Sequence, residues 1–267
     1  MKPKVCITLI EGTNCEDETE RAFRMAGAEA EKVHLKQLTG NCSKERERKL
    51  SDYDALVFPG GFSAGDYVRA GAIWTARIQS KLKKELENFV KEGKVVGGIC
   101  NGFQVLTNLG LLPGTVETAL TTNESAKFES RFVYLKNLRK CSFTYNLDVG
   151  EVRCFPVGHA EGRLTFKPGK EKESLKTLED NNQIMFKYVK PDGSPADLKY
   201  PENPNGSVED IAGVCNLEGN VFGLMPHPER ILNPFNHYSW TREKNLKNEG
   251  EGLAVFKSLV DYIKKEV

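Results

Sequence analysis

The chain of 267 residues has the composition of a globular protein and almost no net charge. Hydrophobic residues make up 39% of it and charged residues 28%, and 38 Lys and Arg balance 37 Asp and Glu, so its charge gives no reason to expect a nucleic acid or an anionic membrane as partner. No apolar run is long enough to cross a bilayer, and the first apolar stretch turns acidic at once, which indicates a first strand and argues against a signal peptide.

The cysteines point to a reducing compartment. There are seven, an odd number, and they are scattered along the chain without a C-x-x-C pair. Zinc-site spacing is therefore absent, and we expect no metal site. Without an export signal, reduced thiols in a cytoplasmic protein are the default expectation.

The first part of the chain alternates between short apolar strands and helices. In chain order we expect a strand at 5–10, a helix at 15–26, a strand at 55–58, a helix at 81–92, a strand at 95–99 and a helix at 102–109. Thr13 or Asn14 should cap the first helix. Short strands that are apolar throughout, alternating with helices, form sheets that are covered on both faces. We therefore predict an α/β fold with a parallel or mixed central sheet and helices on both faces.

After residue 113 the pattern becomes richer in strands. Strands are expected at 131–135, 141–145, 151–157, 183–189, 211–215 and 221–225, with a hairpin turn at 217–220 and a closing amphipathic helix at 253–265. Two polar stretches, 167–182 and 191–207, are interpreted as surface insertions, the first with a short helix at 173–178. There is no internal repeat and no convincing linker, so residues 1–267 are predicted to form a single domain.

Cys100 stands out among the seven cysteines. It lies in GICNG at residues 98–102, between an apolar strand and an amphipathic helix. This G-x-C-x-G pattern is the cysteine form of the nucleophile elbow, a tight strand-to-helix turn that lifts a side chain towards a substrate. The positive end of the following helix dipole favours a thiolate at this position. Cys100 is thus the predicted nucleophile, and the other six cysteines are expected to be structural.

His227 is the best candidate for the base among the four histidines. It follows a strand and lies in PHPE at residues 226–229. Pro228 favours extended backbone at His227, and residues two apart in an extended segment point the same way. Glu229 can then hold one imidazole nitrogen while the other faces Cys100, which predicts a Cys–His–Glu triad. The histidines at 34 and 237 are expected to be surface residues.

Backbone amides at two strand ends are the predicted oxyanion hole, the donors that stabilise negative charge on an attacked carbonyl oxygen. The N–H of Asn101, just after the nucleophile, is one donor. The N–H of Gly61, in the turn before Phe62, is the other, because glycine lets backbone approach a ligand closely. In sheets of this kind the carboxyl ends of the strands meet at one edge, where ligands bind.

The motifs at these strand ends are similar to those of a known family. GICNGFQVL at 98–106 with MPHPER at 225–230 resembles the class I (triad) glutamine amidotransferases, which have a flavodoxin-like α/β fold. The resemblance implies that Cys100 attacks the side-chain amide of L-glutamine, that a γ-glutamyl thioester forms and that ammonia leaves. It further implies that His227 is the acid and base, that Glu229 orients it and that Gln104 contacts the substrate.

A narrower resemblance covers most of the chain. Segments 59–74, 101–104, 123–132, 156–163 and 223–230 are similar to the small glutamine amidotransferase subunits of phosphoribosylformylglycinamidine synthases, enzymes of de novo purine biosynthesis. In that family a separate ATP- and Mg-dependent synthetase subunit uses the ammonia to convert formylglycinamide ribonucleotide to formylglycinamidine ribonucleotide, and a small bridging subunit joins the complex. The chain itself shows no phosphate-binding loop motif, so no cofactor is expected in it. Phe62, Arg131 and His159 lie in segments typical of the family and are candidates for the site or for the interface with the synthetase.

Three alternatives stay open from the sequence. The chain could be the amidotransferase subunit of another biosynthetic pathway, a cysteine hydrolase or peptidase of similar fold, or a non-catalytic interaction protein. The first shares the triad, the second shares the elbow cysteine, and the third predicts that Cys100 is dispensable.

Overall fold

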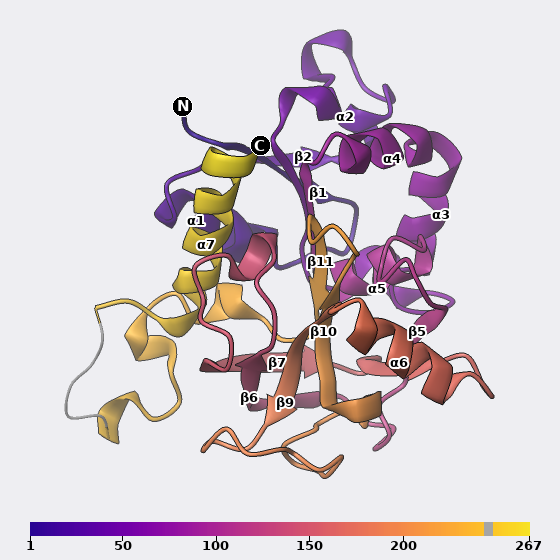
Figure 1. The fold of residues 1–267 in the computed structure, drawn as a ribbon. Coiled ribbons are helices and arrows are strands. Elements are labelled where there is room, and N and C mark those ends of the chain that lie inside the picture. Colours follow the sequence, from indigo (N-terminus) through magenta and orange to yellow (C-terminus); the bar gives the residue numbers. More distant parts are fainter. Residues whose placement is uncertain (243–247) are drawn as a thin grey trace.

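One continuous sheet of nine strands runs through the molecule, and helices cover both of its faces (Figure 1). The structure is a computed structural model that describes residues 1–242 and 248–267. From one edge to the other, the strands are β2 (Glu29–His34), β1 (Lys4–Leu9), β3 (Ala55–Phe58), β4 (Val95–Ile99), β11 (Val221–Leu224), β10 (Ile211–Cys215), β9 (Ile184–Val189), β6 (Glu129–Asn137) and β7 (Val152–His159). The first five strands are parallel to one another, and each later strand is antiparallel to its neighbour.

The helices form two layers. In Figure 1, α1 (Glu16–Met25) and α7 (Glu251–Glu266) lie on one side of the sheet, and α3 (Ala72–Lys81), α4 (Lys83–Lys91) and α5 (Asn101–Asn108) lie on the other. A short α2 (Leu35–Leu38), α6 (Glu171–Asp180) and a separate two-stranded sheet of β5 (Thr118–Thr121) and β8 (Arg163–Phe166) complete the chain. The predicted α/β class, with a mixed sheet covered on both faces, is confirmed.

Aromatic side chains fill the space between the sheet and the layer of α1 and α7. Phe143 stacks on Phe222 of β11 with ring centroids 4.3 Å apart, and its edge meets Phe256 of α7. Phe256 also meets Phe23 of α1 edge-on at 5.1 Å. All four rings are buried, so this cluster fixes α1 and α7 against the central strands through apolar burial and aromatic contact.

The strand predicted at 141–145 is wrong. Residues Ser142–Thr144 form a 3₁₀ turn, in which the Thr144 hydroxyl accepts the Cys141 backbone N–H at 3.0 Å. Residues 141–144 are buried although two of them are polar, and a short run of this composition suits a strand or a packed turn equally well. The local hydrogen bond and the stacking of Phe143 on β11 decide in favour of the turn.

The strand β2 and the helix α3 are among the elements of the parallel half that were not predicted. β2 is an edge strand in which Ala30 and Val33 are buried among polar neighbours, so it has no apolar run. α3 turns a narrow face of Trp74, Thr75 and Ile78 to the core, which gives a weak helical pattern. Both were missed because an element that buries few side chains leaves a weak periodicity.

The first helix starts differently from the prediction. Its N-cap is Cys15, without a side-chain capping hydrogen bond, instead of Thr13 or Asn14. The acidic residues of the first turn are present and complement the helix dipole. Among the described residues, no helix has both the length and the apolar character needed to cross a bilayer.

Candidate active site

Three neighbouring parallel strands end at one edge of the sheet and bring the predicted site residues together. β4 lies between β3 and β11 in the sheet. Cys100 follows β4 directly, Gly60 and Gly61 follow β3, and His227 comes three residues after β11. Parallel strands carry their carboxyl ends to the same edge, which is where doubly wound sheets bind ligands.

Cys100 occupies a strained turn between β4 and α5. Its backbone has φ 51° and ψ −105°, a left-handed conformation that non-glycine residues rarely adopt. Its N–H donates to the Leu224 carbonyl at 2.8 Å, which ties the turn to the end of β11. Such a turn, held by neighbouring strands, is the nucleophile elbow that the sequence predicted.

The glycines on either side of Cys100 are required because backbone packs against them. A Cβ atom at Gly102 would lie 2.0 Å from the Phe58 carbonyl oxygen of β3. One at Gly98 would lie 2.6 Å from the carbonyl of Gly102. These atoms belong to the main chain and cannot rotate away, so α5 can begin this close to the sheet only if both positions lack a side chain.

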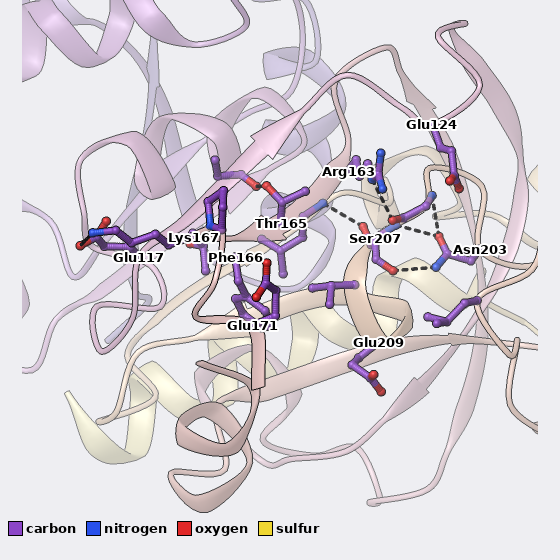
Figure 2. Close-up of a pocket in the computed structure, with 17 residues that line it drawn as sticks. Glu117, Glu124, Arg163, Thr165, Phe166, Lys167, Glu171, Asn203, Ser207 and Glu209 are labelled. Carbon is purple, nitrogen blue, oxygen red and sulfur yellow. Dashed lines mark hydrogen bonds and ion pairs between the residues drawn. The ribbon is translucent and has the colours of Figure 1, made fainter. Parts of the chain in front are cut away.

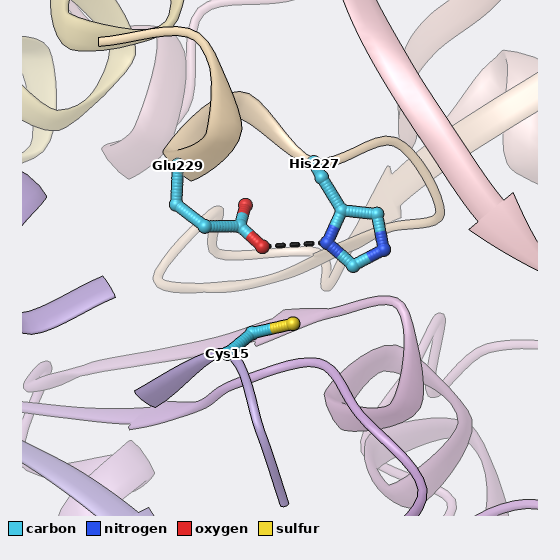
Figure 3. Close-up of side chains that lie close together, drawn as sticks. All are labelled: Cys15, His227 and Glu229. Carbon is cyan, nitrogen blue, oxygen red and sulfur yellow. Dashed lines mark hydrogen bonds and ion pairs between the residues drawn. The ribbon is translucent and has the colours of Figure 1, made fainter. Parts of the chain in front are cut away.

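His227 and Glu229 form a buried pair beside the elbow. The His227 N–H donates to the Pro156 carbonyl of β7 at 2.8 Å, which fixes the backbone of the histidine. The Nδ1 atom of its ring lies 2.5 Å from Oε1 of Glu229, and both side chains are buried (Figure 3). Because Nδ1 is hydrogen-bonded to the Glu229 carboxylate, Nε2 is the ring nitrogen that is available to Cys100.

The charges around His227 favour its protonated form. Burial by itself lowers the pKa of His227, but the negative charge of Glu229 and the interaction with Cys100 outweigh it and raise the pKa well above its usual value. An imidazole with a raised pKa takes a proton readily, which is what a base for the Cys100 thiol must do.

The turn after β3 has two positions without side chains, Gly60 and Gly61, and packs against the loop after β1. Gly61 has φ 134°, and a Cβ atom there would lie 2.5 Å from the Asn14 side-chain oxygen, so the position requires glycine. The Phe62 N–H donates to the backbone carbonyl of Gly12, and the Ala64 N–H donates to that of Glu11. These bonds tie the turn to the end of β1.

A polar network lies under the elbow. Asn101 is buried, and its amide donates to Gln104 Oε1 at 2.9 Å and to Asp66 at 3.4 Å. Gln104 in turn donates to the Glu161 carbonyl at 2.6 Å. Three segments of the chain thus meet beside Cys100 through these side chains. The structure therefore places Asn101 and Gln104 next to the predicted nucleophile.

Asp66 is the titratable member of this network with a shifted pKa. Burial and the nearby charge of Glu161 raise its pKa to about 6. The folded state then holds the proton more tightly than the unfolded chain, whose Asp titrates near 3.9. The free energy of unfolding therefore decreases as the pH rises from about 4 through about 6 and Asp66 ionises.

We expect Asp66→Asn to raise the free energy of unfolding by about 1 kcal/mol at pH 8. This value is set below the full effect of the raised pKa, because the Asp66 side chain is half-exposed and solvent screens its charge. The gain should fall towards zero at pH 4, where Asp66 of the folded wild-type protein is protonated and therefore neutral, like the amide of the variant. Urea unfolding at pH 4, 6 and 8 measures the difference. A gain that is independent of pH would contradict this account and would indicate a backbone effect of the substitution.

The remaining candidates have different surroundings. Phe62 is 45% exposed and lies 6.4 Å from the Phe128 ring, at the surface beside the turn. His159 is buried, and burial together with the charge of His227 lowers its pKa to about 3, so it is neutral at physiological pH. Its Nδ1 lies 3.1 Å from the Asn123 side-chain oxygen.

Arg131 belongs to a separate part of the surface. Its guanidinium lies over the Tyr200 ring, 4.5 Å from the centroid, and donates to the Pro201 carbonyl at 3.3 Å. These contacts tie β6 to the second polar stretch. These two contacts account for the position of the Arg131 side chain, and neither of them involves a residue of the predicted triad.

Two site residues were missed from the sequence. Cys15, expected to be structural, lies with His227 and Glu229 in one buried cluster whose sulfur, nitrogen and oxygen atoms are all within 4.8 Å of one another (Figure 3). Arg230 donates to its sulfur from Nη2 at 3.1 Å. Arg230 stands next to the predicted triad in the sequence, but the start of α1 is far away in the chain, so only the fold could reveal the contact.

The donor set of this cluster resembles that of a metal site, but its geometry is that of a hydrogen-bonded group. The 2.5 Å separation of His227 Nδ1 and Glu229 Oε1 leaves no room for an ion bound to both atoms. The positively charged guanidinium of Arg230 already contacts the Cys15 sulfur. Both features oppose a cation here.

Two large cavities lie away from these residues. One of about 840 Å³ lies between β8 and residues 203–209 (Figure 2), and one of about 800 Å³ lies against α3 at the ends of β1 and β2. Neither is lined by Cys100 or His227. Cys100 is only 5% exposed, so the elbow is nearly closed in this conformation.

The second polar stretch supports the site from the wall of the first cavity. Asn205 and Ser207 are buried, and both donate to the Gly162 carbonyl, at 2.8 and 3.3 Å. Gly162 follows Glu161, the residue whose carbonyl accepts from Gln104. The stretch 191–207 therefore has buried positions that brace the turn beside the elbow.

Comparison with known proteins assigns the chain to a family. The family model described as CobB/CobQ-like glutamine amidotransferase domain matches residues 2–263. Two curated relatives, each named phosphoribosylformylglycinamidine synthase subunit PurQ, come from Archaeoglobus fulgidus (50% identical, covering 98% of this chain and 97% of the relative) and Pyrococcus horikoshii (40% identical, covering 98% and 99%).

Solved structures agree with this assignment. A chain in the structure of PurLQS from Thermotoga maritima is 33% identical, with a TM-score of 0.73, and the match covers 98% of this chain and 100% of that one. A glutamine amidotransferase from the same organism has a TM-score of 0.54 at 14% identity, which shows a shared fold. With a family model that spans nearly the whole chain and a relative of 50% identity, the chain belongs to the CobB/CobQ-like glutamine amidotransferase family.

Proposed function

We propose that this chain is the glutaminase subunit of a phosphoribosylformylglycinamidine synthase, and that Cys100, His227 and Glu229 are its catalytic triad. The observation that carries the proposal is the strained left-handed turn at Cys100 beside a buried His227–Glu229 pair. The name shared by the relatives from Archaeoglobus fulgidus and Pyrococcus horikoshii supports the choice of pathway. The reaction is hydrolysis of L-glutamine to glutamate and ammonia in de novo purine biosynthesis.

The first half of the reaction forms a thioester. His227 takes the proton of Cys100, and the sulfur attacks the side-chain carbonyl carbon of glutamine. The carbonyl oxygen becomes an oxyanion, which the N–H groups of Asn101 and Gly61 stabilise. His227 then returns the proton to the amide nitrogen, the C–N bond breaks and ammonia leaves.

The second half regenerates the enzyme. His227 removes a proton from a water molecule, whose oxygen attacks the thioester carbon through a second oxyanion. The C–S bond breaks, the sulfur takes back a proton from His227 and glutamate leaves. Glu229 keeps Nδ1 protonated and stabilises the imidazolium that forms in both halves, so Nε2 always faces the reacting atoms.

Gln104 is the proposed contact to the substrate glutamine. In this conformation its amide is engaged by Asn101 and by the Glu161 carbonyl, and Cys100 is nearly covered. Substrate binding therefore requires the segment around Glu161 to move. An enzyme that is closed when alone and opened by its partner does not release ammonia without an acceptor.

The ammonia is passed to an ATP- and Mg-dependent synthetase subunit, which converts formylglycinamide ribonucleotide to formylglycinamidine ribonucleotide. A small bridging subunit is the third component, in line with the three letters in the name of the Thermotoga maritima structure, PurLQS. This chain uses no cofactor of its own in the proposal. A cytoplasmic location fits it, because the structure joins none of the seven cysteines in a disulfide bond.

The test is reconstitution of the reaction with separately purified synthetase and bridging subunits. Glutamine hydrolysis by this chain is measured alone and with the partners, and formylglycinamidine ribonucleotide formation is measured with glutamine or with ammonium. We expect the partners to stimulate hydrolysis, and we expect glutamine-dependent synthesis to need this chain while ammonium-dependent synthesis does not. Synthesis from glutamine in its absence, or full ATP-dependent synthesis by this chain alone, would refute the division of labour.

A further inference from the structure

A cavity of about 800 Å³ lies outside the proposed site, between α3 and the ends of β1 and β2. Its volume is typical of a pocket for a small molecule, for which roughly 300–1,000 Å³ is usual. Because β1 and β2 are parallel, their ends place it at the carboxyl-terminal edge of the sheet, where doubly wound sheets bind ligands. We call it the α3 cavity, since Arg77 and Lys81 of α3 line it.

The charged side chains that line the α3 cavity are mostly cationic. Lys36, Arg77 and Lys81 line it together with a single carboxylate, that of Glu11. Glu11 pairs with Arg77 and accepts from Nη1 and Nη2 at 2.8 and 2.5 Å. Lys36 and Lys81 have no ion-pair partner within residues 1–242 and 248–267. The cavity therefore carries a surplus of positive charge, which attracts an anion.

His34 adds a neutral hydrogen-bond donor to the lining. Its Nδ1 accepts the Lys36 backbone N–H at 3.1 Å, so that nitrogen carries no proton. Burial lowers the pKa of His34, the charge of Lys36 lowers it further, and Arg77 acts in the same direction against an opposing effect of Glu11. The ring is therefore neutral near pH 7, with its proton on Nε2.

The lining of the α3 cavity also has an apolar part. Ile10 and Leu35 are 1% and 4% exposed, and Ile73 of α3 lines the cavity with them. A guanidinium binds phosphate through charge-assisted hydrogen bonds, and an apolar surface next to it is covered best by a ring. Inorganic phosphate alone would leave that surface in water. The combination therefore favours a ligand that has both groups.

Arg77 can exchange the Glu11 carboxylate for a phosphate. Both side chains of this ion pair are exposed, and exposed pairs contribute little to stability. The main chain of Glu11 is fixed, because its carbonyl accepts the Ala64 N–H at 2.7 Å. Only the Glu11 side chain has to turn away, so Glu11 competes with the ligand for the guanidinium.

The larger cavity, of about 840 Å³, has the opposite charge. It is lined by four glutamates and two cationic residues, which are Glu117, Glu124, Glu171, Glu209, Arg163 and Lys167. Its excess of negative charge repels a phosphate, so the charge of the lining distinguishes the two cavities.

We propose that the α3 cavity binds a phosphorylated small molecule with an apolar ring. The cationic side chains hold the phosphate, Arg77 above all, and the ring covers Ile10 and Leu35. Neither Cys100 nor His227 lines this cavity, so the inference goes beyond the proposed function and does not rest on it.

The test is isothermal titration calorimetry on the full chain without partner subunits, so that no nucleotide site of a synthetase contributes. The probes are adenosine 5′-monophosphate, adenosine, ribose 5-phosphate and inorganic phosphate, in about 50 mM NaCl, where screening is weak. We expect one adenosine 5′-monophosphate to bind per chain, roughly tenfold more tightly than adenosine or ribose 5-phosphate, because each of these lacks one of the two recognised groups. Higher salt should weaken the binding.

Substitutions of the two members of one ion pair should change this affinity in opposite directions. Arg77→Gln should weaken binding of adenosine 5′-monophosphate roughly tenfold, because hydrogen bonds from a charged donor are lost. Glu11→Gln should tighten it about threefold, because Arg77 is released from its competitor. The control is the pair of Arg24 and Glu20 in α1, on the other side of the sheet, where Arg24→Gln and Glu20→Gln should leave the affinity unchanged.

A double variant, Lys36→Gln with Lys81→Gln, keeps the test decisive if Arg77→Gln does not fold. Both lysines are exposed, so their loss should spare the fold and still weaken binding roughly tenfold. Three outcomes would overturn the inference: no binding of adenosine 5′-monophosphate at millimolar concentration, inorganic phosphate binding equally tightly, or wild-type affinity in the variants that lack cations. None of them bears on glutamine hydrolysis, whereas an inactive reconstituted complex would reject the proposed function and leave this inference standing.

Discussion

Glutamine hydrolysis should fall by about four to six orders of magnitude in Cys100→Ala, because alanine offers no nucleophile at the elbow. The strained turn places this one side chain above the sheet edge, so a neighbouring thiol cannot take over from its own fixed position. The measurement is glutamate release in the reconstituted complex, where the wild-type rate is highest. The same variant should still support ammonium-dependent synthesis at the wild-type rate.

Cys215→Ala is the matched control for Cys100→Ala. Cys215 is a buried thiol at the end of β10, outside the triad, and its removal should leave the rate of glutamine hydrolysis unchanged. An active Cys100→Ala enzyme would reject the nucleophile assignment and favour a non-catalytic role for the elbow. Failure of the variant to assemble with the synthetase and bridging subunits would indicate that the substitution disturbs the complex and not only the chemistry.

Glu229→Gln is expected to lower kcat by about three to four orders of magnitude while the protein stays folded. The carboxylate oxygen that accepts from Nδ1 at 2.5 Å is replaced by an amide that can donate to the same nitrogen, which favours the tautomer with Nε2 protonated. The negative charge that raises the pKa of His227 is lost as well. Steady-state kinetics of glutamine hydrolysis from pH 5 to pH 9 measures both effects.

The pH profile of glutamine hydrolysis should show the direction in which the pKa of His227 changes in Glu229→Gln. Without Glu229, burial dominates and lowers the pKa of His227, so the imidazolium exists only at lower pH and the corresponding limb of the profile should move towards acid. Glu117→Gln removes an exposed carboxylate that pairs with Lys167, and it should leave both kcat and the profile unchanged. A Glu229→Gln enzyme with more than a tenth of wild-type activity would mean that the carboxylate does not orient His227.

The local chemistry of the site could be predicted because short motifs encode it. G-x-C-x-G sets the turn at Cys100, since the two glycines allow α5 to start against the sheet. The pairing of His227 with Glu229 is present, but the extended backbone expected there is wrong, because Pro228–Arg230 form a 3₁₀ turn that brings the two side chains together. The strands at 55–58, 95–99 and 211–215 were also predicted with correct bounds, because fully buried strands appear as short apolar runs bounded by turn residues.

Longer-range contacts could not be predicted, because their partners are far apart in the chain. Asp66 and Glu161 interact across two loops, and their mutual repulsion with burial raises the pKa of Asp66 to about 6. The second polar stretch, interpreted as a surface insertion, places Asn205 and Ser207 inside the protein because both bond to Gly162. A polar residue that is buried against a distant carbonyl looks like a solvated one in the sequence.

The sequence by itself determined the class of fold and predicted the turn at Cys100 and the His227–Glu229 pair, since the strands and each of these two motifs are encoded by residues within a few positions of one another. Only the tertiary structure decided that Cys15 and Arg230 flank the His227–Glu229 pair and that Gln104 bonds the Glu161 carbonyl. The physical reason is that a hydrogen bond between distant segments exists only after the sheet has aligned the strand ends that carry them.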